Sequence, residues 1–320
     1  KLMRLSLAIL ILIGTCLQGQ VLGPYGSAAG SPGSTAIAKD SSIIKSWATN
    51  CSVLRGYWDI DKPALDTVTY GQAADAIGPA DGQVVSLGDS GLATFDLAFP
   101  ISDANGPDFA IFENSFSDVF LELAFVEVSS NGIDFVRFPA HSLVQDSAET
   151  AGFGATAPSL LYNFAGKYRG DFGVPFDLAE LKDSSRVNIN SISHIRLVDV
   201  IGAVGKPYSS RDAFGNVVND PYPTAYASGG FDLDALAFLH PSSLAEKEYE
   251  LRQSKPYPNP SAGQIHWPKA VALSVYSLSG ASLLAAEGES INLSPLMPGT
   301  YFLKAEGLNG EMKLELIIKI

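Results

Sequence analysis

The chain has 320 residues, with 21 Lys and Arg against 34 Asp and Glu, which gives a formal net charge of -13. This acidic balance argues against a protein that binds nucleic acid or anionic membranes, because both partners require a basic face. Hydrophobic residues make up 46% of the chain and aromatic residues 10%, which is enough for a packed core and excludes a largely disordered chain. At roughly one domain per ~150 residues, the length predicts two domains.

Residues 1–20 have the pattern of a secretory signal peptide. A basic start precedes the apolar run Leu5 to Ile13, and small or polar residues follow. Because this run is too short to span a bilayer, we expect it to be removed, leaving no transmembrane segment in the mature chain. Cys16 leaves lipidation open as an alternative, although Thr15 is larger than the residue that usually precedes a lipidated cysteine.

The second cysteine, Cys51, has no partner if Cys16 leaves with the signal peptide, so no intrachain disulfide is then possible. A catalytic thiol would need a nearby base, and no histidine lies near Cys51 in the sequence. We therefore interpret Cys51 as a packed, unreactive residue.

The remaining chain divides by composition into four segments. Residues 21–41 are rich in small residues and predict a flexible leader. Residues 42–242 contain short apolar runs separated by Gly, Asn, Asp and Pro turns, which predicts a β-sandwich. Residues 243–256 are charged and predict a linker, and residues 257–320 predict a second, smaller β-domain.

Seven segments of the larger domain have strand length and an apolar or alternating pattern. They are Gln83–Leu87, Leu92–Phe99, Phe109–Phe112, Leu121–Ser129, Phe135–Phe138, His194–Ile201 and Phe231–Leu239. The pair Asn131-Gly132 is typical of a tight hairpin turn between the fourth and fifth of these strands. The sequence thus predicts an all-β protein, with an antiparallel jelly-roll-like β-sandwich followed by a small Ig-like β-sandwich.

Ordered motifs run through the C-terminal segment. They are Tyr257-Pro258-Asn259-Pro260, Val275–Gly280, Ile291–Leu296, Pro298–Leu303 and Lys313–Lys319. Together they resemble the C-terminal sorting domain of the bacterial type IX secretion system, whereas an ordinary Ig-like accessory domain is the alternative. The resemblance implies recognition by the type IX machinery, delivery to the outer surface or exterior of a Gram-negative bacterium, and loss of this domain on delivery.

Motifs in the larger domain carry a second resemblance. They are Val84–Gly88, Gly106–Asn114, Leu123–Gly132, Ala165–Tyr168 and Ser228–Ala235. They resemble a family of bacterial cell-surface proteins, and Val126–Phe135 is similar to the strand-turn-strand of galactose-binding-type jelly rolls. The resemblance implies a surface-exposed binding domain, and it associates such proteins with corrinoid uptake.

Several carboxylates have the spacing of calcium ligands. Asp103, Asn105 and Asp108 lie in one tight turn, with Glu113 after the next strand. Calcium takes six to eight oxygen ligands, which such turns supply. Asp232 and Asp234 should face the same side of a strand, with Phe231, Leu233 and Ala235 facing the other. We therefore predict a structural Ca²⁺ at these residues, which the galactose-binding resemblance also implies, with Asx turns and solvent-facing acids as the alternative.

Polar loops containing tyrosines are the candidate ligand-binding region. Aromatic faces beside amide and carboxylate groups can hold sugars or other polar rings. The predicted ligand-binding residues are Asn114, Tyr168, Arg169, Asp171, Asp212, Asn216, Asn219, Asp220, Tyr222 and Tyr226. The alternative is that these residues only hold the loops to the core.

The run Gly88-Asp89-Ser90-Gly91 copies a serine-protease motif, yet the four histidines of the chain occur in no partner motif. We interpret it as a hairpin turn. The sequence then favours a non-catalytic protein that binds an extracellular carbohydrate, with a corrinoid or other small nutrient as the second ligand. The rivals are a glycoside hydrolase that uses Glu113 and Asp234 across an open cleft, and a structural or adhesive surface protein.

Overall fold

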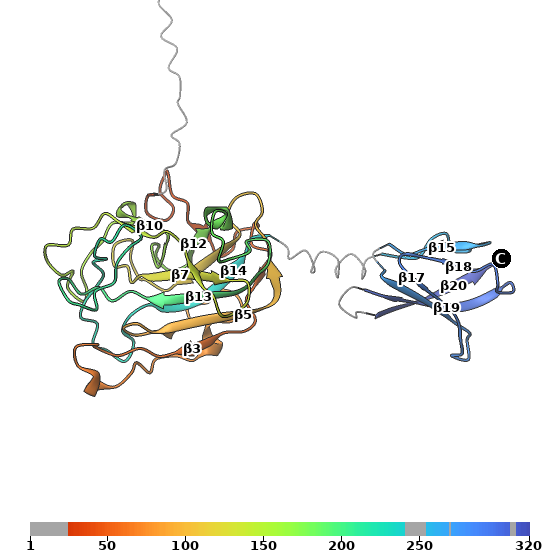
Figure 1. The fold of residues 1–320 in the computed structure, drawn as a ribbon, viewed down its shortest axis with the longest axis horizontal. Helices are drawn as coiled ribbons and strands as arrows, with labels where there is room; N and C mark the ends of the chain where they lie inside the picture. The colour runs from red at the N-terminus through yellow and green to blue at the C-terminus, as the bar shows by residue number, and fades with distance from the viewer. Residues whose placement is uncertain (1–24, 241–253, 269, 308–311) are drawn as a thin grey trace, which may run out of the picture.

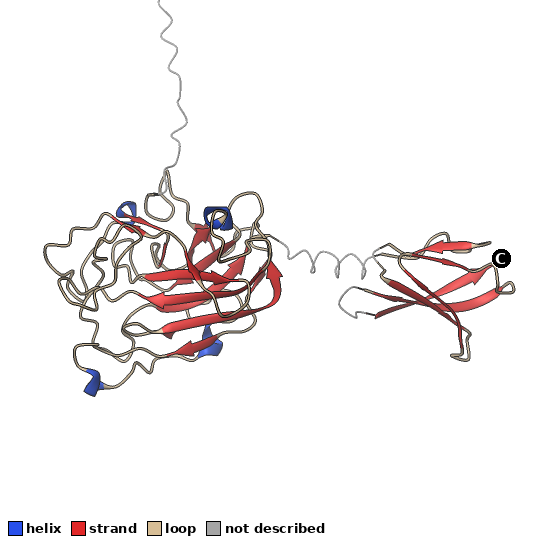
Figure 2. Cartoon of the chain, in the orientation of Figure 1, coloured by secondary structure: helices blue, strands red, loops and turns tan. Residues whose placement is uncertain are grey.

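The computed structural model describes residues 25–240, 254–268, 270–307 and 312–320. The predicted signal peptide, Cys16 and residues 243–253 of the predicted linker lie outside these ranges. Within them, the regular secondary structure is mostly β-strand and the helices are short, as Figure 2 shows. The described part of the chain contains no helix with the length and hydropathy that a membrane span requires.

The larger domain is a sandwich of two antiparallel sheets, which confirms the all-β prediction (Figure 1). The first sheet has the order β1-β12-β6-β14-β2, and β4 also pairs with β14. Its strands are β1 (Ile37–Ala38), β2 (Ser46–Trp47), β4 (Val85–Ser86), β6 (Phe109–Glu113), β12 (Phe172–Phe176) and β14 (Asp232–Phe238).

The second sheet has the order β11-β7-β13-β5-β3, with β8 paired to β7, and Figure 1 shows β7, β13, β5 and β3 side by side. Its strands are β3 (Ser52–Leu54), β5 (Leu92–Ile101), β7 (Ala124–Ser129), β8 (Val136–Arg137), β11 (Phe164–Ala165) and β13 (Ile192–Asp199). A separate pair consists of β9 (His141–Ser142) and β10 (Leu161–Tyr162). The predicted hairpin at Asn131-Gly132 joins β7 to β8, and Gly132 has the positive φ of 73° that this turn requires.

The helices are single turns of 3-10 type: η1 (Pro63–Leu65), η2 (Ala73–Ala76), η3 (Pro158–Leu160) and η4 (Leu178–Leu181). They lie in connections between strands, and none is an amphipathic helix that could supply a core face. The core of the larger domain is therefore made mainly by the two sheets, and the turns η2 and η4 add Ala76, Leu178 and Leu181 to it.

Apolar side chains that alternate along the strands fill the space between the sheets. Phe109 is 0% exposed, and its ring stacks on Phe176 with the ring centres 5.4 Å apart. Cys51 is also buried in this core, and burial raises the pKa of its thiol to about 12. A thiol with such a pKa stays protonated at neutral pH, as expected of a packed, unreactive residue.

Strand β14 departs from the predicted alternation because it contains a bulge. The pairing of β14 with β6 shifts register between Leu233 and Ala235, which makes Asp234 an extra residue. Leu233 packs in the core between the sheets, whereas Ala235 packs in a different cluster with Phe112 and Ala110. The prediction that Ala235 faces the same side as Phe231 and Leu233 is therefore wrong.

Two further expectations need correction. The segment predicted as a flexible leader contains β1, which pairs with β12, and Ile37 is only 6% exposed. The ordered domain thus begins before residue 42 because these apolar residues complete one edge of a sheet. Gly88 to Gly91 does form a turn, with a hydrogen bond from Gly91 N to Gly88 O, but it is no hairpin: β4 and β5 belong to different sheets.

The C-terminal domain is a smaller antiparallel β-structure with its own core around Trp267, which is 0% exposed. One sheet has the order β17-β16-β19-β20, and β15 pairs with β18. The strands are β15 (Gln264–His266), β16 (Ala272–Tyr276), β17 (Ser282–Glu287), β18 (Ser290–Asn292), β19 (Gly299–Glu306) and β20 (Met312–Lys319). The motifs noted in the sequence mark its turns, since Gly280, with φ of 86°, lies between the paired strands β16 and β17.

Candidate functional site

A cavity of about 460 Å³ opens beside the ends of β6 and β14. Its lining combines four aromatic rings with two carboxylates and the Asn114 amide. We call it the aromatic cavity; its aromatic and acidic members are Phe116, Phe120, Phe153, Tyr226, Glu122 and Asp232.

The aromatic rings form a continuous row. The centres of Phe116 and Phe120 lie 4.8 Å apart, those of Phe120 and Phe153 5.7 Å apart, and those of Phe153 and Tyr226 5.9 Å apart. Phe116 is 76% exposed, Phe153 71% and Tyr226 54%. Because folding would favour burying such rings, their shared exposure beside a cavity indicates an interaction site.

Local hydrogen bonds fix the loops that carry these rings. Ser117 Oγ accepts from Phe120 N at 2.9 Å, and the Ser115 hydroxyl donates to the Phe120 carbonyl. Thr156 N donates to Val119 O at 2.7 Å, which ties the loop of Phe153 to that of Phe120. The rings are therefore held as a set by backbone contacts.

A group of buried carboxylates, here called the acid cluster, lies next to the cavity and shares Glu122 and Asp232 with its lining. It consists of Glu113, Glu122, Asp199, Asp220 and Asp232, which are 1%, 7%, 2%, 4% and 9% exposed, respectively. Gly166 holds Glu122 in place: its φ is 79°, and a Cβ at this position would lie 1.8 Å from the Glu122 carbonyl oxygen. Only glycine fits there.

Hydrogen bonds satisfy the acid cluster only in part. Asp199 accepts from Phe231 N at 2.7 Å and from Ser90 N at 3.1 Å, so both of its oxygens are used. Asp232 accepts from the Ser86 hydroxyl. These two members of the cluster are therefore at least partly satisfied.

The other three members keep unpaired oxygens. Glu113 Oε2 accepts from the amide of Ser115 at 2.8 Å, but Glu113 Oε1 is buried without a partner. Asp220 Oδ2 accepts from the amide of Leu123 at 3.3 Å, and Asp220 Oδ1 has no partner. The structure records no hydrogen bond or ion pair for the Glu122 carboxylate among the described residues.

The pKa values of these carboxyl groups are raised by burial and by one another's charges. Burial raises the pKa of Glu113 well above its usual range, and the charges of Glu122 and Asp232 raise it further. Burial likewise raises the pKa of Asp220, to which Asp199 and Glu122 add. Removing carboxylates from water without a counter-charge disfavours their ionised form, so this cluster needs protons or a cation.

The predicted calcium ligands separate into different places. Asp103 and Asp108 do come together, and Asp177 joins them, with oxygens of all three within 4.8 Å of one another. Among the described residues no other three acidic, histidine or cysteine side chains lie so close. Asn105 lies in the same turn as Asp103 and Asp108 and is exposed.

Glu113 and Asp232 belong to the acid cluster, whereas Asp234 lies apart from it because of the bulge in β14. Asp234 Oδ1 accepts from Asp81 N at 3.1 Å, and Asp234 Oδ2 accepts from Gly82 N at 3.2 Å. The predicted metal ligands Asp103, Asn105, Asp108, Glu113, Asp232 and Asp234 are therefore distributed over separate places in the domain.

The predicted ligand-binding residues also divide. Asn114 and Tyr226 line the aromatic cavity. Tyr168 is 1% exposed, and its hydroxyl pairs with Thr35 Oγ1 at 2.8 Å inside the domain. Arg169 pairs with Asp118 at 3.1 Å, and Asp171 pairs with Lys39 at 2.7 Å, both near the surface.

The loop residues from 212 to 222 hold the loop to the domain, as the alternative interpretation stated. Asn219 is 0% exposed and donates to Gln145 O at 2.7 Å and Ala148 O at 2.8 Å. Asp212 Oδ1 accepts from Asn216 N at 2.9 Å, and Asp212 Oδ2 from the Asn216 side chain at 3.1 Å. Tyr222 is 5% exposed, with its hydroxyl 3.3 Å from Asp59 Oδ1, and Asp220 belongs to the acid cluster.

Sequence reasoning missed Phe116, Phe120, Glu122 and Phe153. Two signals could have indicated them. Phe116 and Phe120 lie in a Ser- and Asp-containing loop rather than in a strand pattern, and Glu122 interrupts the apolar run Leu121 to Val126. A charge inside an apolar run is unfavourable unless the fold has a use for it.

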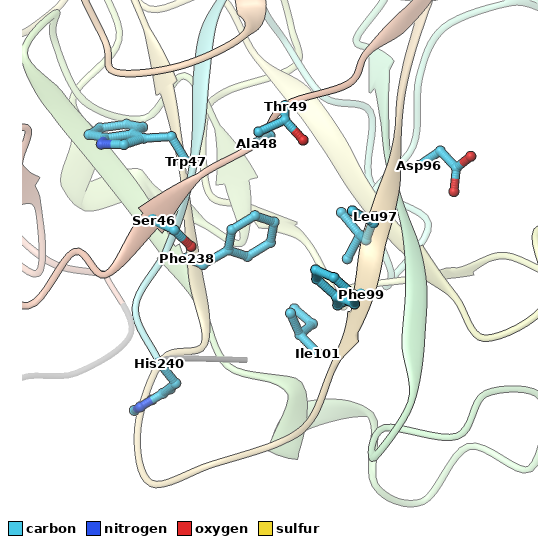
Figure 3. Close-up of a pocket in the computed structure, with 11 residues that line it drawn as sticks. Ser46, Trp47, Ala48, Thr49, Asp96, Leu97, Phe99, Ile101, Phe238 and His240 are labelled. Atoms are coloured by element: carbon cyan, nitrogen blue, oxygen red, sulfur yellow. The ribbon is translucent and has the colours of Figure 1, made fainter. Parts of the chain in front are cut away.

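A second cavity, of about 250 Å³, lies between the two sheets (Figure 3). Trp47 and Phe238 line it from the first sheet, and Leu97, Phe99 and Ile101 line it from β5. Such an apolar slot offers a polar ligand few hydrogen-bond partners. The aromatic cavity, with its mixed lining, is the better candidate for a ligand that carries hydroxyl groups.

The carboxylate pair suggested for a hydrolase does not span a cleft. Glu113 is 1% exposed and Asp234 is 3% exposed, and the Asp234 carboxylate is occupied by backbone amides. A glycosidase pair must face the substrate on both sides of the bond to be cleaved. Glu113 and Asp234 therefore cannot act together as that pair.

Comparison with known proteins assigns the C-terminal domain. Residues 255–319 match the family described as the secretion system C-terminal sorting domain. This segment is a sorting domain. The match confirms the type IX prediction, and it makes the protein a secreted or surface protein that the type IX machinery recognises.

The larger domain gains no assignment from the comparisons. No curated protein matches the chain. Two structures of β-glucuronidase from Parabacteroides merdae, one with glycerol in its active site, are 11% identical to the chain and have TM-scores of 0.23 and 0.18. The two alignments cover 89% and 85% of this chain. This chain spans only about a third of the length of each β-glucuronidase, 36% and 35%. Scores this low carry no argument about function, and the galactose-binding resemblance is not confirmed.

Proposed function

We propose that the larger domain is a non-catalytic binding module that holds an extracellular carbohydrate in the aromatic cavity. The sorting domain delivers this module to the cell surface or the exterior. The observation that carries the proposal is the row of exposed rings beside buried carboxylates and the Asn114 amide. Sugar rings stack on aromatic faces through their C–H groups, while their hydroxyls donate to carboxylate and amide oxygens.

The charge of the cavity narrows the class of ligand. Glu122 and Asp232 face the cavity and belong to a cluster of five carboxylates, so an anionic ligand would add a further acidic group to a site of low dielectric. We therefore expect neutral or amino sugars to bind better than uronic acids of the same ring size. A corrinoid or other nutrient is the second candidate, because the same rings could stack on a flat, uncharged ring system.

The test removes one ring at a time. Phe153→Ala or Tyr226→Ala should weaken binding of the best neutral oligosaccharide about tenfold or more, because each ring is a large exposed contact. Isothermal titration calorimetry on the full chain measures the dissociation constant. Tyr70→Ala is the matched control, because Tyr70 is also 54% exposed but does not line the cavity.

Calorimetry with a set of sugars and corrinoids, together with an assay for released reducing sugar, also distinguishes the rival functions. Equal affinities for wild type and both cavity variants would refute the proposed site. Binding of a corrinoid but of no sugar would identify the ligand as a nutrient of that class instead of a carbohydrate. Release of reducing sugar by the wild type, lost in Glu122→Gln, would identify a hydrolase, and a failure of every ligand would leave the structural or adhesive role.

A further inference from the structure

The hydrogen bonds of the acid cluster do not compensate for the cost of burying its negative charges. Five carboxylates are buried together, and the ion pairs seen among the described residues are made by other acids. Arg55 acts on Asp232 only through its more distant charge, while its guanidinium donates to the carbonyls of Tyr70, Gly71 and Ser86. Buried charges of one sign are retained only when something neutralises them.

The unpaired oxygens identify where the missing partner belongs. Glu113 Oε1, Asp220 Oδ1 and the Glu122 carboxylate are the atoms without donors, and each of these residues is more than nine-tenths buried. The amide of Leu123, next to Glu122 in the chain, donates to Asp220 Oδ2 at 3.3 Å. The charges of Glu113 and Glu122 raise the pKa of Asp220, so the three carboxylates lie in one buried region. Glu122 also lines the aromatic cavity, which gives an ion a route from solvent.

We propose that Glu113, Glu122 and Asp220 bind a divalent cation of the calcium class beside the aromatic cavity, which Glu122 lines. Calcium prefers hard oxygen ligands, tolerates irregular coordination, and is supplied outside the cell, where the sorting domain sends this protein. Asn114 and the Asp232 carboxylate lie in the same cavity lining and offer further oxygens.

This site differs from the group formed by Asp103, Asp108 and Asp177. That group lies closer together, and Asp103 Oδ1 is also buried without a partner. Its Asp108, however, accepts from the amides of Ala104 and Leu178 at 2.9 and 2.8 Å, and His240 Nε2 lies 4.0 Å from Asp108 Oδ1. The acid cluster is looser, with no three of its oxygen-bearing side chains within 4.8 Å of one another. Calcium ligands lie at about 2.3–2.6 Å, so binding must draw these carboxylates together and tighten the surrounding loops.

The first measurement is thermal melting of the full chain at neutral pH with a chelator, with calcium, and with magnesium. Calcium at about 100 times its dissociation constant should raise the melting temperature by about 5–10 °C. Magnesium should have a smaller effect, because it demands a compact octahedral set of ligands. Titration calorimetry with calcium chloride alone gives the stoichiometry without any sugar present.

Conservative variants then locate the ion. Glu122→Gln keeps the shape and removes one buried charge, so we expect the chelated variant to melt above the chelated wild type and to lose the calcium shift. Glu113→Gln and Asp220→Asn should behave alike, and they keep the test available if one variant does not fold. Asp103→Asn is the matched control, and it should retain the full shift.

Two results would overturn the proposal. A calcium shift that survives Glu122→Gln and disappears in Asp103→Asn would place the ion at the Asp103 group. The absence of both a calcium shift and binding heat in the wild type would mean that protons, not a cation, neutralise the acid cluster. Because the probe is the metal alone, neither result depends on whether the aromatic cavity binds carbohydrate.

Discussion

Trp267→Ala is expected to lower the free energy of unfolding of the sorting domain by about 3–5 kcal/mol, the usual loss when a large buried ring is removed. Trp267 is 0% exposed at the centre of that domain's core, and its indole N–H donates to Ser254 Oγ at 2.8 Å. A domain of this size is stabilised by only about 3–10 kcal/mol, so the substitution should remove a large part of its stability and raise its unfolded fraction. Circular dichroism during urea unfolding measures the loss.

The same substitution should also block delivery. Because the type IX machinery recognises the sorting domain, a protein whose sorting domain is unfolded should stay in the periplasm of the producing bacterium. Leu278→Ala is the control, since Leu278 is 62% exposed in the same domain and its loss leaves no cavity. Normal delivery of the destabilised Trp267→Ala protein would show that the machinery recognises the sorting domain even when that domain is unfolded.

Asp89→Asn is expected to make the protein more stable at neutral pH, by up to about 3 kcal/mol, and to leave its stability at acidic pH unchanged. Asp89 is 3% exposed, and burial raises its pKa from 3.8 to about 6, which corresponds to about 3 kcal/mol between the two protonation states. The charged form is the one that burial disfavours. An asparagine stays neutral and can still accept from Ile60 N, as Asp89 Oδ2 does at 2.8 Å.

The direction of the pH effect follows from proton binding. Between about pH 4 and pH 6 the folded protein holds the Asp89 proton while the unfolded chain has released it. The free energy of unfolding of the wild type therefore falls as pH rises through this range, and the variant should lose less. Urea unfolding with a chelator present, at a series of pH values, measures the difference.

Asp183→Asn serves as the control for Asp89→Asn, because Asp183 is an exposed acid and its substitution should not change the slope. The interpretation is contradicted if Asp89→Asn has the same pH dependence as wild type, since the Asp89 carboxyl would then titrate alike in both states. A loss of stability at every pH would instead mean that the amide disrupts the contact with Ile60.

The sequence predicted most of the strands because strand formation leaves a local signal. Leu92 to Phe99 alternates, and it lies within β5 (Leu92–Ile101). Asn131-Gly132 specifies its turn through a positive φ that few residues accept, so β7 and β8 could be paired from those two residues. The sorting domain was recognisable for the same reason, since its motifs mark turns that the chain must make.

The candidate site could be predicted only in fragments. Asn114 and Tyr226 were proposed as ligand-binding residues and do line one cavity, but the other rings and the Glu122 carboxylate were not expected there. The six proposed calcium ligands were chosen by sequence spacing, and a single bulge at Asp234 was enough to separate Asp234 from Asp232. Spacing along a strand predicts a shared face only while the register is unbroken.

An all-β protein with a C-terminal sorting domain can be predicted from the chain alone, because strand pattern, turn residues and sorting motifs are all local. Which acids come together depends on the packing of the sheets. The acid cluster comes from β6, β13, β14 and two connecting segments, and it forms because the two sheets pack against each other. Its members are Glu113, Glu122, Asp199, Asp220 and Asp232. Their burial, and the unpaired oxygens that point to a cation, arise from contacts between residues far apart in the chain, which no local pattern encodes.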